Sequence, residues 1–455
     1  MSTVADTVTA FLRAASVPRE DEGAPAHAAG TLEEAEAMLA AHPEVALASV
    51  HTAAVLGDDA GVRAILATEP GSATERGGPW DWDALTYLCF SRFLRLDPAR
   101  SDGFVRAARA LLDAGADPNT GFFEETHQPH REWESVLYGA AGVAHHAALT
   151  RLLLERGADP NDAETPYHAP ETYDNGAVLA LLDSRRLTPD SLATLLLRKA
   201  DWHDHEGMRL LLERGVDPNH LGRWRHPTLQ HALMRDNALA TIELLLDHGA
   251  NPLLQPEGDS ALELAARRGR GDVLRLFAQR GLMRALEGVD AVAAACAMGD
   301  EAAVRSIARV APPVVEQVKA EGGSLLAQFA GNGNTEGVRL LLDLGVPIDA
   351  VYERGDGYFG SAPGSTALHV AAWRARPETV QLLLQRGASV DARDGAGRTP
   401  LQLAVAACVA SWWTNRRSPD SVQALLAAGA SVEGVPCPCG YEEVDELLRQ
   451  HGAAG

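Results

Sequence analysis

Cysteine is scarce in this chain, and long apolar runs are missing from it. The five cysteines are too few and too scattered for the disulfide framework of a small secreted protein. No stretch approaches the roughly 20 apolar residues that a membrane-spanning helix requires. The N-terminal segment also lacks the basic region and apolar core that mark a secretory signal. We therefore expect a cytoplasmic protein that does not bind membranes.

Positive charge is also in short supply. The chain has 40 basic and 62 acidic residues, which gives a formal net charge of −22. Such a chain repels phosphate groups, so neither nucleic acid nor an anionic membrane is expected as its main ligand. The charge favours a protein partner that presents arginine or lysine.

One helix ending recurs eight times along the chain. Each copy places leucine shortly before a glycine, and glycine at this point is typical of the left-handed residue that follows a helix. The glycines lie 42, 58, 34, 32, 64, 42 and 42 residues apart, which indicates a period of about 33 residues with insertions. They are Gly115, Gly157, Gly215, Gly249, Gly281, Gly345, Gly387 and Gly429.

A second pattern precedes several of these endings. It reads STALHVAA from Ser365 and RTPLQLAV from Arg398. Thr399 is suited to cap a helix, and Pro400 at the first helical position lacks only an N–H that would have no helical partner. Together the two patterns resemble the ankyrin repeat, and the chain resembles a bacterial-type ankyrin-repeat protein over nearly its whole length.

This resemblance implies an all-α fold, an ankyrin-repeat solenoid of about ten helix-turn-helix units. A finger, meaning the loop before the first helix of a unit, is extended in several units. We expect an N-terminal helical cap at residues 1–50, the repeat array at 51–435 and a C-terminal capping helix at 436–455. The resemblance carries over no catalytic residue, and we expect no cofactor and no metal.

A tight turn separates the two helices of each predicted unit. Residue types that tolerate a positive φ occupy this turn, so we interpret them as a requirement of the backbone. The histidines among them are accordingly predicted to be structural. The residues are Gly57, Gly269, Gly299 and Gly333, with Asn237, His145 and His203 at the same position in three other units.

Four insertions interrupt the repeat, and we look for function there because stacking does not require them. They cover about residues 120–134, 162–186, 350–364 and 411–419, and the second includes a short extra helix near Gly176. Aromatic residues make up only 5% of the chain, yet they gather in or beside the fingers. Either these aromatics are exposed anchors, or the long fingers fold back and bury them as small satellite cores.

The first hypothesis is a non-catalytic protein–protein interaction module. Fingers and first helices line the concave side of ankyrin arrays, so a partner with a basic patch would bind the concave, acidic, finger-extended face. The candidate binding residues are Trp80, Trp82, Phe122, Phe123, His127, Tyr167, His168, Trp224, Tyr352, Tyr358 and Phe359.

The second hypothesis is a small-molecule-binding protein or enzyme whose pocket is roofed by the long fingers of the N-terminal half. His127, Glu124 and Glu125 would then supply acid–base chemistry. His127 and His130 have the chemistry of metal ligands, but no regular spacing fixes them in their loop, so we predict no metal there. A purely structural scaffold is the third hypothesis.

Overall fold

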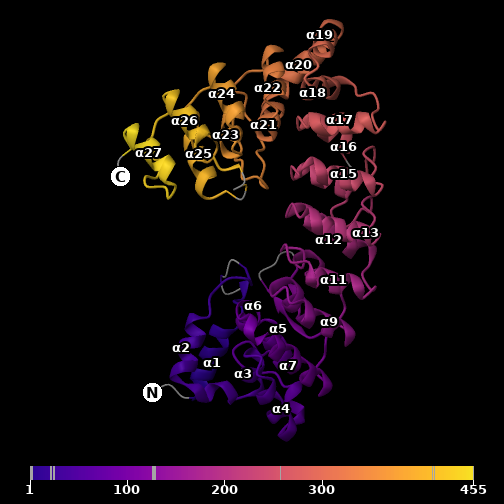
Figure 1. Ribbon diagram of the computed structural model, residues 1–455, viewed down its shortest axis with the longest axis vertical. Coiled ribbons are helices and arrows are strands. Elements are labelled where there is room, and N and C mark those ends of the chain that lie inside the picture. The colour runs from indigo at the N-terminus through magenta and orange to yellow at the C-terminus, as the bar shows by residue number, and fades with distance from the viewer. Residues whose placement is uncertain are drawn as a thin grey trace. The chain divides into compact units, whose positions relative to one another are not determined.

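The computed structural model describes residues 4–20, 23, 26–125, 130–256, 258–411, 413 and 416–453 (Figure 1). The chain divides into two compact units. The first comprises Met1–Thr228 with Asp247–Ala250, and the second comprises Leu229–Leu246 with Asn251–Gly455.

The first unit is built from short helices that pack in succession. Helix α3 packs against α5, α4 against α7, α7 against α9, and α9 against α11. The helices are α1 (Val4–Ala15), α2 (Glu33–Ala41), α3 (Val50–Val55), α4 (Asp59–Thr68), α5 (Ala84–Cys89), α6 (Arg92–Leu96), α7 (Ser101–Asp113), α8 (Val136–Tyr138), α9 (Ala147–Glu155), α10 (Thr165–His168), α11 (Gly176–Asp183), α12 (Pro189–Asp201) and α13 (His205–Glu213).

The second unit has a similar internal arrangement from α16 onward. Helices α21, α23 and α25 pack one against the next, and so do α22, α24 and α26 (Figure 1). The helices from Thr228 on are α14 (Thr228–Met234), α15 (Leu239–Asp247), α16 (Ala261–Arg267), α17 (Gly271–Gln279), α18 (Gly288–Met298), α19 (Glu301–Val310), α20 (Pro312–Ala320), α21 (Gly322–Asn332), α22 (Thr335–Asp343), α23 (Ala367–Trp373), α24 (Pro377–Gln385), α25 (Pro400–Val409), α26 (Asp420–Ala427) and α27 (Glu442–Gln450).

Left-handed residues end the helices where the sequence predicted them. All eight repeat glycines have positive φ, from 66° at Gly281 to 101° at Gly115 and Gly157. At the start of α25, the Thr399 side chain accepts a hydrogen bond from the Gln402 amide, and Pro400 occupies the first turn, as predicted. The local signals for beginning and ending helices are therefore confirmed.

The turns between paired helices follow the prediction with one correction. The four predicted glycines, His145 and His203 all have positive φ, but in the remaining unit the left-handed residue is Asp236, with φ 55°, and not Asn237. The Asn237 amide donates to the Ala232 carbonyl, as the Asp58 amide donates to Ala53 in the turn after Gly57. Asn237 therefore corresponds to the residue that follows the turn glycine elsewhere.

Two of the predicted insertions adopt regular structure. Residues 120–134 contain most of an antiparallel hairpin of β1 (Gly121–Glu124) and β2 (Glu132–Ser135), so among the described residues the predicted all-α fold carries one pair of strands. Residues 162–186 contain α10 as well as the expected extra helix, α11. Because α10 contacts α12 while α11 packs on α9, this segment contributes a helix pair to the stack.

Within the described ranges, no helix is both long and apolar enough to span a membrane.

Candidate functional site

The β1–β2 hairpin separates its side chains into an outer and an inner face. Phe123 is paired with Trp133, whereas Phe122 is paired with Glu134 and Glu124 with Glu132. Because successive side chains of a strand point to opposite faces, Phe123 and Trp133 share one face, and Phe122 lies on the other with three glutamates. The hairpin thus presents an aromatic outer face and an acidic inner face.

The outer aromatic pair is accessible to solvent. Phe123 is 37% exposed and Trp133 is 36% exposed. Their ring centroids lie 4.7 Å apart in an edge-on arrangement, and the Arg131 guanidinium lies 3.9 Å from the centre of the Phe123 ring. Two exposed aromatic rings held side by side on a hairpin are suited to anchor a protein partner.

Other predicted binding aromatics of the first unit form a satellite core. Trp82 stacks on Phe122 with centroids 4.4 Å apart, and both are buried. Phe90 and Tyr138 extend this cluster, and His27 packs edge-on against Phe122. Trp80 is half-buried and lies beside Trp82. Trp82 and Phe122 are therefore buried in a satellite core, whereas their neighbour Phe123 is exposed.

Tyr167 and Trp224 lie side by side in the structure. Their rings are stacked with centroids 5.9 Å apart. The Arg198 guanidinium lies 4.0 Å from the Tyr167 ring centre, and that of Arg223 lies 4.5 Å from the Trp224 ring centre. Both aromatic residues are half-buried, so each retains part of its surface for contact.

His168 bridges two carboxylates. Its Nε2 lies 3.0 Å from Glu164 Oε2, and its Nδ1 lies 3.0 Å from Glu171 Oε2. Burial disfavours the charged ring, but the hydrogen bonds to these two carboxylates outweigh that effect and raise the pKa of His168 to about 9. His168 is therefore a cation at neutral pH that holds Glu164 in place.

The three acid–base candidates of the second hypothesis have separate environments. Glu124 is fully buried; its Oε1 accepts from the Glu20 amide at 3.2 Å and lies 3.1 Å from His27 Nε2. Glu125 is exposed and forms a 3.3 Å ion pair with Arg131. His127 lies outside the described residues. Glu124 has the partners of a structural carboxylate, and Glu125 those of a surface ion pair.

In the second unit, the aromatics of residues 350–364 lie against polar side chains of the same unit. The Tyr352 hydroxyl accepts a 2.8 Å hydrogen bond from Gln328. The Arg235 guanidinium lies 4.0 Å from the Tyr358 ring centre, and that of Arg374 lies 3.9 Å from the ring centre of the buried Phe359. This segment therefore folds back onto its neighbours.

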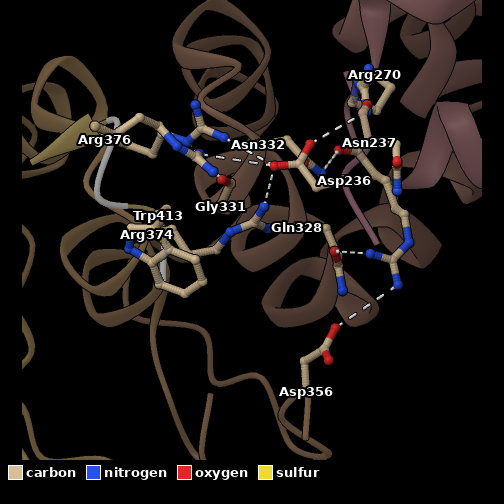
Figure 2. A network of polar contacts seen from close by, with 12 residues as sticks. Asp236, Asn237, Arg270, Gln328, Gly331, Asn332, Asp356, Arg374, Arg376 and Trp413 are labelled. Carbon is tan, nitrogen blue, oxygen red and sulfur yellow. Dashed lines mark hydrogen bonds and ion pairs between the residues drawn. The ribbon is translucent and has the colours of Figure 1, made fainter. Parts of the chain in front are cut away.

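Arg374 belongs to a cluster of arginines around Asp236, which Figure 2 shows at close range. The Asp236 carboxylate accepts from Arg374 and lies 3.2 Å from Arg376, 3.4 Å from Arg270 and 3.9 Å from Arg416. Arg374 is only 2% exposed, and its burial lowers its pKa while Asp236 opposes that shift. The Asp236 carboxylate thus joins parts of the chain that lie as far as 138 residues away in the sequence, at Arg374.

Neither the Asp236 cluster nor the acidic inner face was predicted from the sequence. Nothing local to Asp236 distinguishes it, since its partners lie far along the chain. Glu132 and Glu134, in contrast, have a local signal, because two glutamates on either side of Trp133 place both carboxylates on one face of a strand. Recognising residues 132–135 as a strand would have revealed it.

Comparison with known proteins identifies the repeats. A family model described as ankyrin repeats (3 copies) matches residues 291–394, and one described as ankyrin repeats (many copies) matches residues 229–278. Among solved structures, the chain is similar to the crystal structure of the human ASB11 ankyrin repeat domain, with 20% sequence identity, a TM-score of 0.26, and coverage of 57% of this chain and 98% of that chain. No curated protein matches the chain. The chain therefore contains ankyrin repeats, which the family models place at residues 229–278 and 291–394.

Proposed function

We propose that this chain is a non-catalytic module that binds a protein partner, with the outer face of the β1–β2 hairpin as an anchor. Ankyrin repeats are generally protein-interaction modules, which supports the class of function. The observation that carries the choice of surface is the exposed pair of Phe123 and Trp133 on one face of the hairpin.

The proposed partner presents a basic patch and meets the chain in the cytoplasm. The net charge of −22 favours encounter with a positively charged surface. Half-buried aromatics predicted to bind, among them Trp80, Tyr167 and Trp224, extend the proposed contact surface. Aromatic anchors contribute most to such interfaces, while the charges govern encounter rate and specificity.

Capture from a native lysate tests this function. We expect a Phe123→Ala/Trp133→Ala variant to lose a protein that the wild-type chain retains, and we expect that capture to weaken as salt is raised. Tyr173→Ala is the matched control, because Tyr173 is an exposed aromatic outside the hairpin. Thermal melting of each variant checks folding. Equal capture by the wild type and the hairpin variant would exclude this surface.

The comparisons give no support to the alternative of a small-molecule-binding protein or enzyme with a roofed pocket.

A further inference from the structure

Three carboxylates converge between the inner face of the hairpin and the start of α10. One oxygen each from Glu132, Glu134 and Glu164 lies within 4.8 Å of the other two. Glu132 and Glu134 come from the inner face of β2, and Glu164 directly precedes α10. Carboxylates this close repel one another when all are ionised, so a bound cation or a retained proton must offset their charge.

Glu134 is the most deeply buried of the three carboxylates. Its side chain is 2% exposed, and within the described part of the chain its buried Oε2 has no hydrogen-bond partner. Glu124 lies on the same face of the same hairpin and differs in this respect, because the Glu20 amide donates to it and His27 and Arg19 lie beside it. An unpartnered carboxylate oxygen is costly to bury, and Glu134 also supplies one of the three clustered oxygens.

We propose that Glu132, Glu134 and Glu164 bind a divalent cation of the size of Ca²⁺. Carboxylate oxygens are the ligands that hard cations prefer. Ligands at about 2.3–2.6 Å from Ca²⁺ lie at most about 5 Å apart, which accommodates three oxygens within 4.8 Å of one another. This site departs from the expectation of no metal, and it does not depend on the proposed protein partner.

The surrounding contacts hold the ligands in position. The Ser135 hydroxyl donates a 2.6 Å hydrogen bond to Asp162, which joins the end of β2 to the segment before α10. Asp162 also accepts from the Thr165 amide at 2.5 Å. His168 holds one oxygen of Glu164 at 3.0 Å. Such second-layer contacts orient metal ligands and make binding less costly in entropy.

Calorimetric titration of the full chain with CaCl₂ tests the site. The variants are Glu134→Gln and Glu132→Gln, with Glu125→Gln as control because Glu125 is an exposed glutamate of the same hairpin. We expect one Ca²⁺ to bind the wild type and the control equally, and each site variant to bind more than about tenfold more weakly. We also expect Ca²⁺ to raise the melting temperature of the wild type above its value in chelator.

Several results would overturn the assignment. One is the absence of both binding heat and a Ca²⁺-dependent melting shift in the wild type. Another is unchanged affinity in both site variants, since Ca²⁺ would then bind other acidic groups of this highly charged chain. Equal or tighter binding of Mg²⁺ would contradict the assigned ion size. If Glu134→Gln does not fold, Glu132→Gln decides the question, because Glu132 is only half-buried.

Discussion

Asp236 combines an unusual backbone conformation with an unusual electrostatic environment. Its φ of 55° is tolerated by few residues other than glycine, asparagine and aspartate. Its carboxylate also lies against four arginines, of which Arg270 and Arg374 are buried. Removing that single negative charge would leave buried guanidinium groups without compensation.

We therefore expect Asp236→Asn to destabilise the chain by about 3–5 kcal/mol, because asparagine keeps the left-handed turn but removes the charge. Asp272→Asn is the control, since the Asp272 side chain is 39% exposed and forms its ion pair with Arg270; the loss of this charge should cost less than about 1 kcal/mol. Urea unfolding measures both values. Equal losses in the two variants would show that the cluster adds nothing beyond a surface ion pair.

Glu134 makes the stability of the folded chain depend on pH. Burial and the nearby carboxylates of Glu164 and Glu124 raise the pKa of Glu134 from 4.5 to about 9. The folded chain retains this proton at pH values where the unfolded chain releases it. The resulting stability is fully present below pH 4.5 and is lost as pH rises through about 9.

In chelator, the free energy of unfolding of the wild type should accordingly fall relative to Glu134→Gln by about 1.4 kcal/mol per pH unit between about pH 6 and 8. Urea titrations at several pH values measure this slope. Parallel pH profiles for the two proteins would mean that Glu134 ionises normally in the folded state.

Helix endings depend on signals a few residues long, and for that reason they could be read from the sequence. Glycine after a leucine-rich turn predicted all eight left-handed endings, and Thr399 with Pro400 predicted the start of α25. These features need no knowledge of distant contacts.

Structure that depends on packing could not be read in the same way. The segment at residues 162–186 appeared to be an insertion, although Thr165, Pro166 and His168 follow the sequence signature that begins an ankyrin helix. The burial of Trp82 and Phe122 depends on contact between two fingers, and the Asp236 cluster joins residues 138 positions apart. The acidic site was missed because its strand was not recognised.

The cost of a left-handed helix ending is measurable at Gly215. Its φ is 85°, and a Cβ there would meet no atom within 4 Å, so Gly215→Ala introduces backbone strain without a clash. We expect a loss of about 1–2 kcal/mol in the free energy of unfolding. Gly71→Ala also meets open space but at ordinary φ, and it should be neutral or slightly stabilising. Equal effects would contradict the backbone explanation.

The stacking of helices predicts how far the effect of a destabilising substitution extends within each unit. In the second unit, α22 packs on α18, α21 and α24, and its Leu341 is fully buried. In an array of this kind, stability is a sum of local terms and interfaces between neighbours, so disturbance should decline with distance along the stack.

We expect Leu341→Ala to cost about 2–5 kcal/mol, because it leaves a cavity in a packed helix interface. Native-state hydrogen exchange should accelerate most in α21–α24 and least in α3–α5 of the first unit. The matched variant is Leu212→Ala in α13, where Leu212 is buried in the first unit, and it should place the acceleration there instead. If either substitution accelerates exchange uniformly throughout the chain, both units unfold as one cooperative structure, and the additive description of the array does not apply.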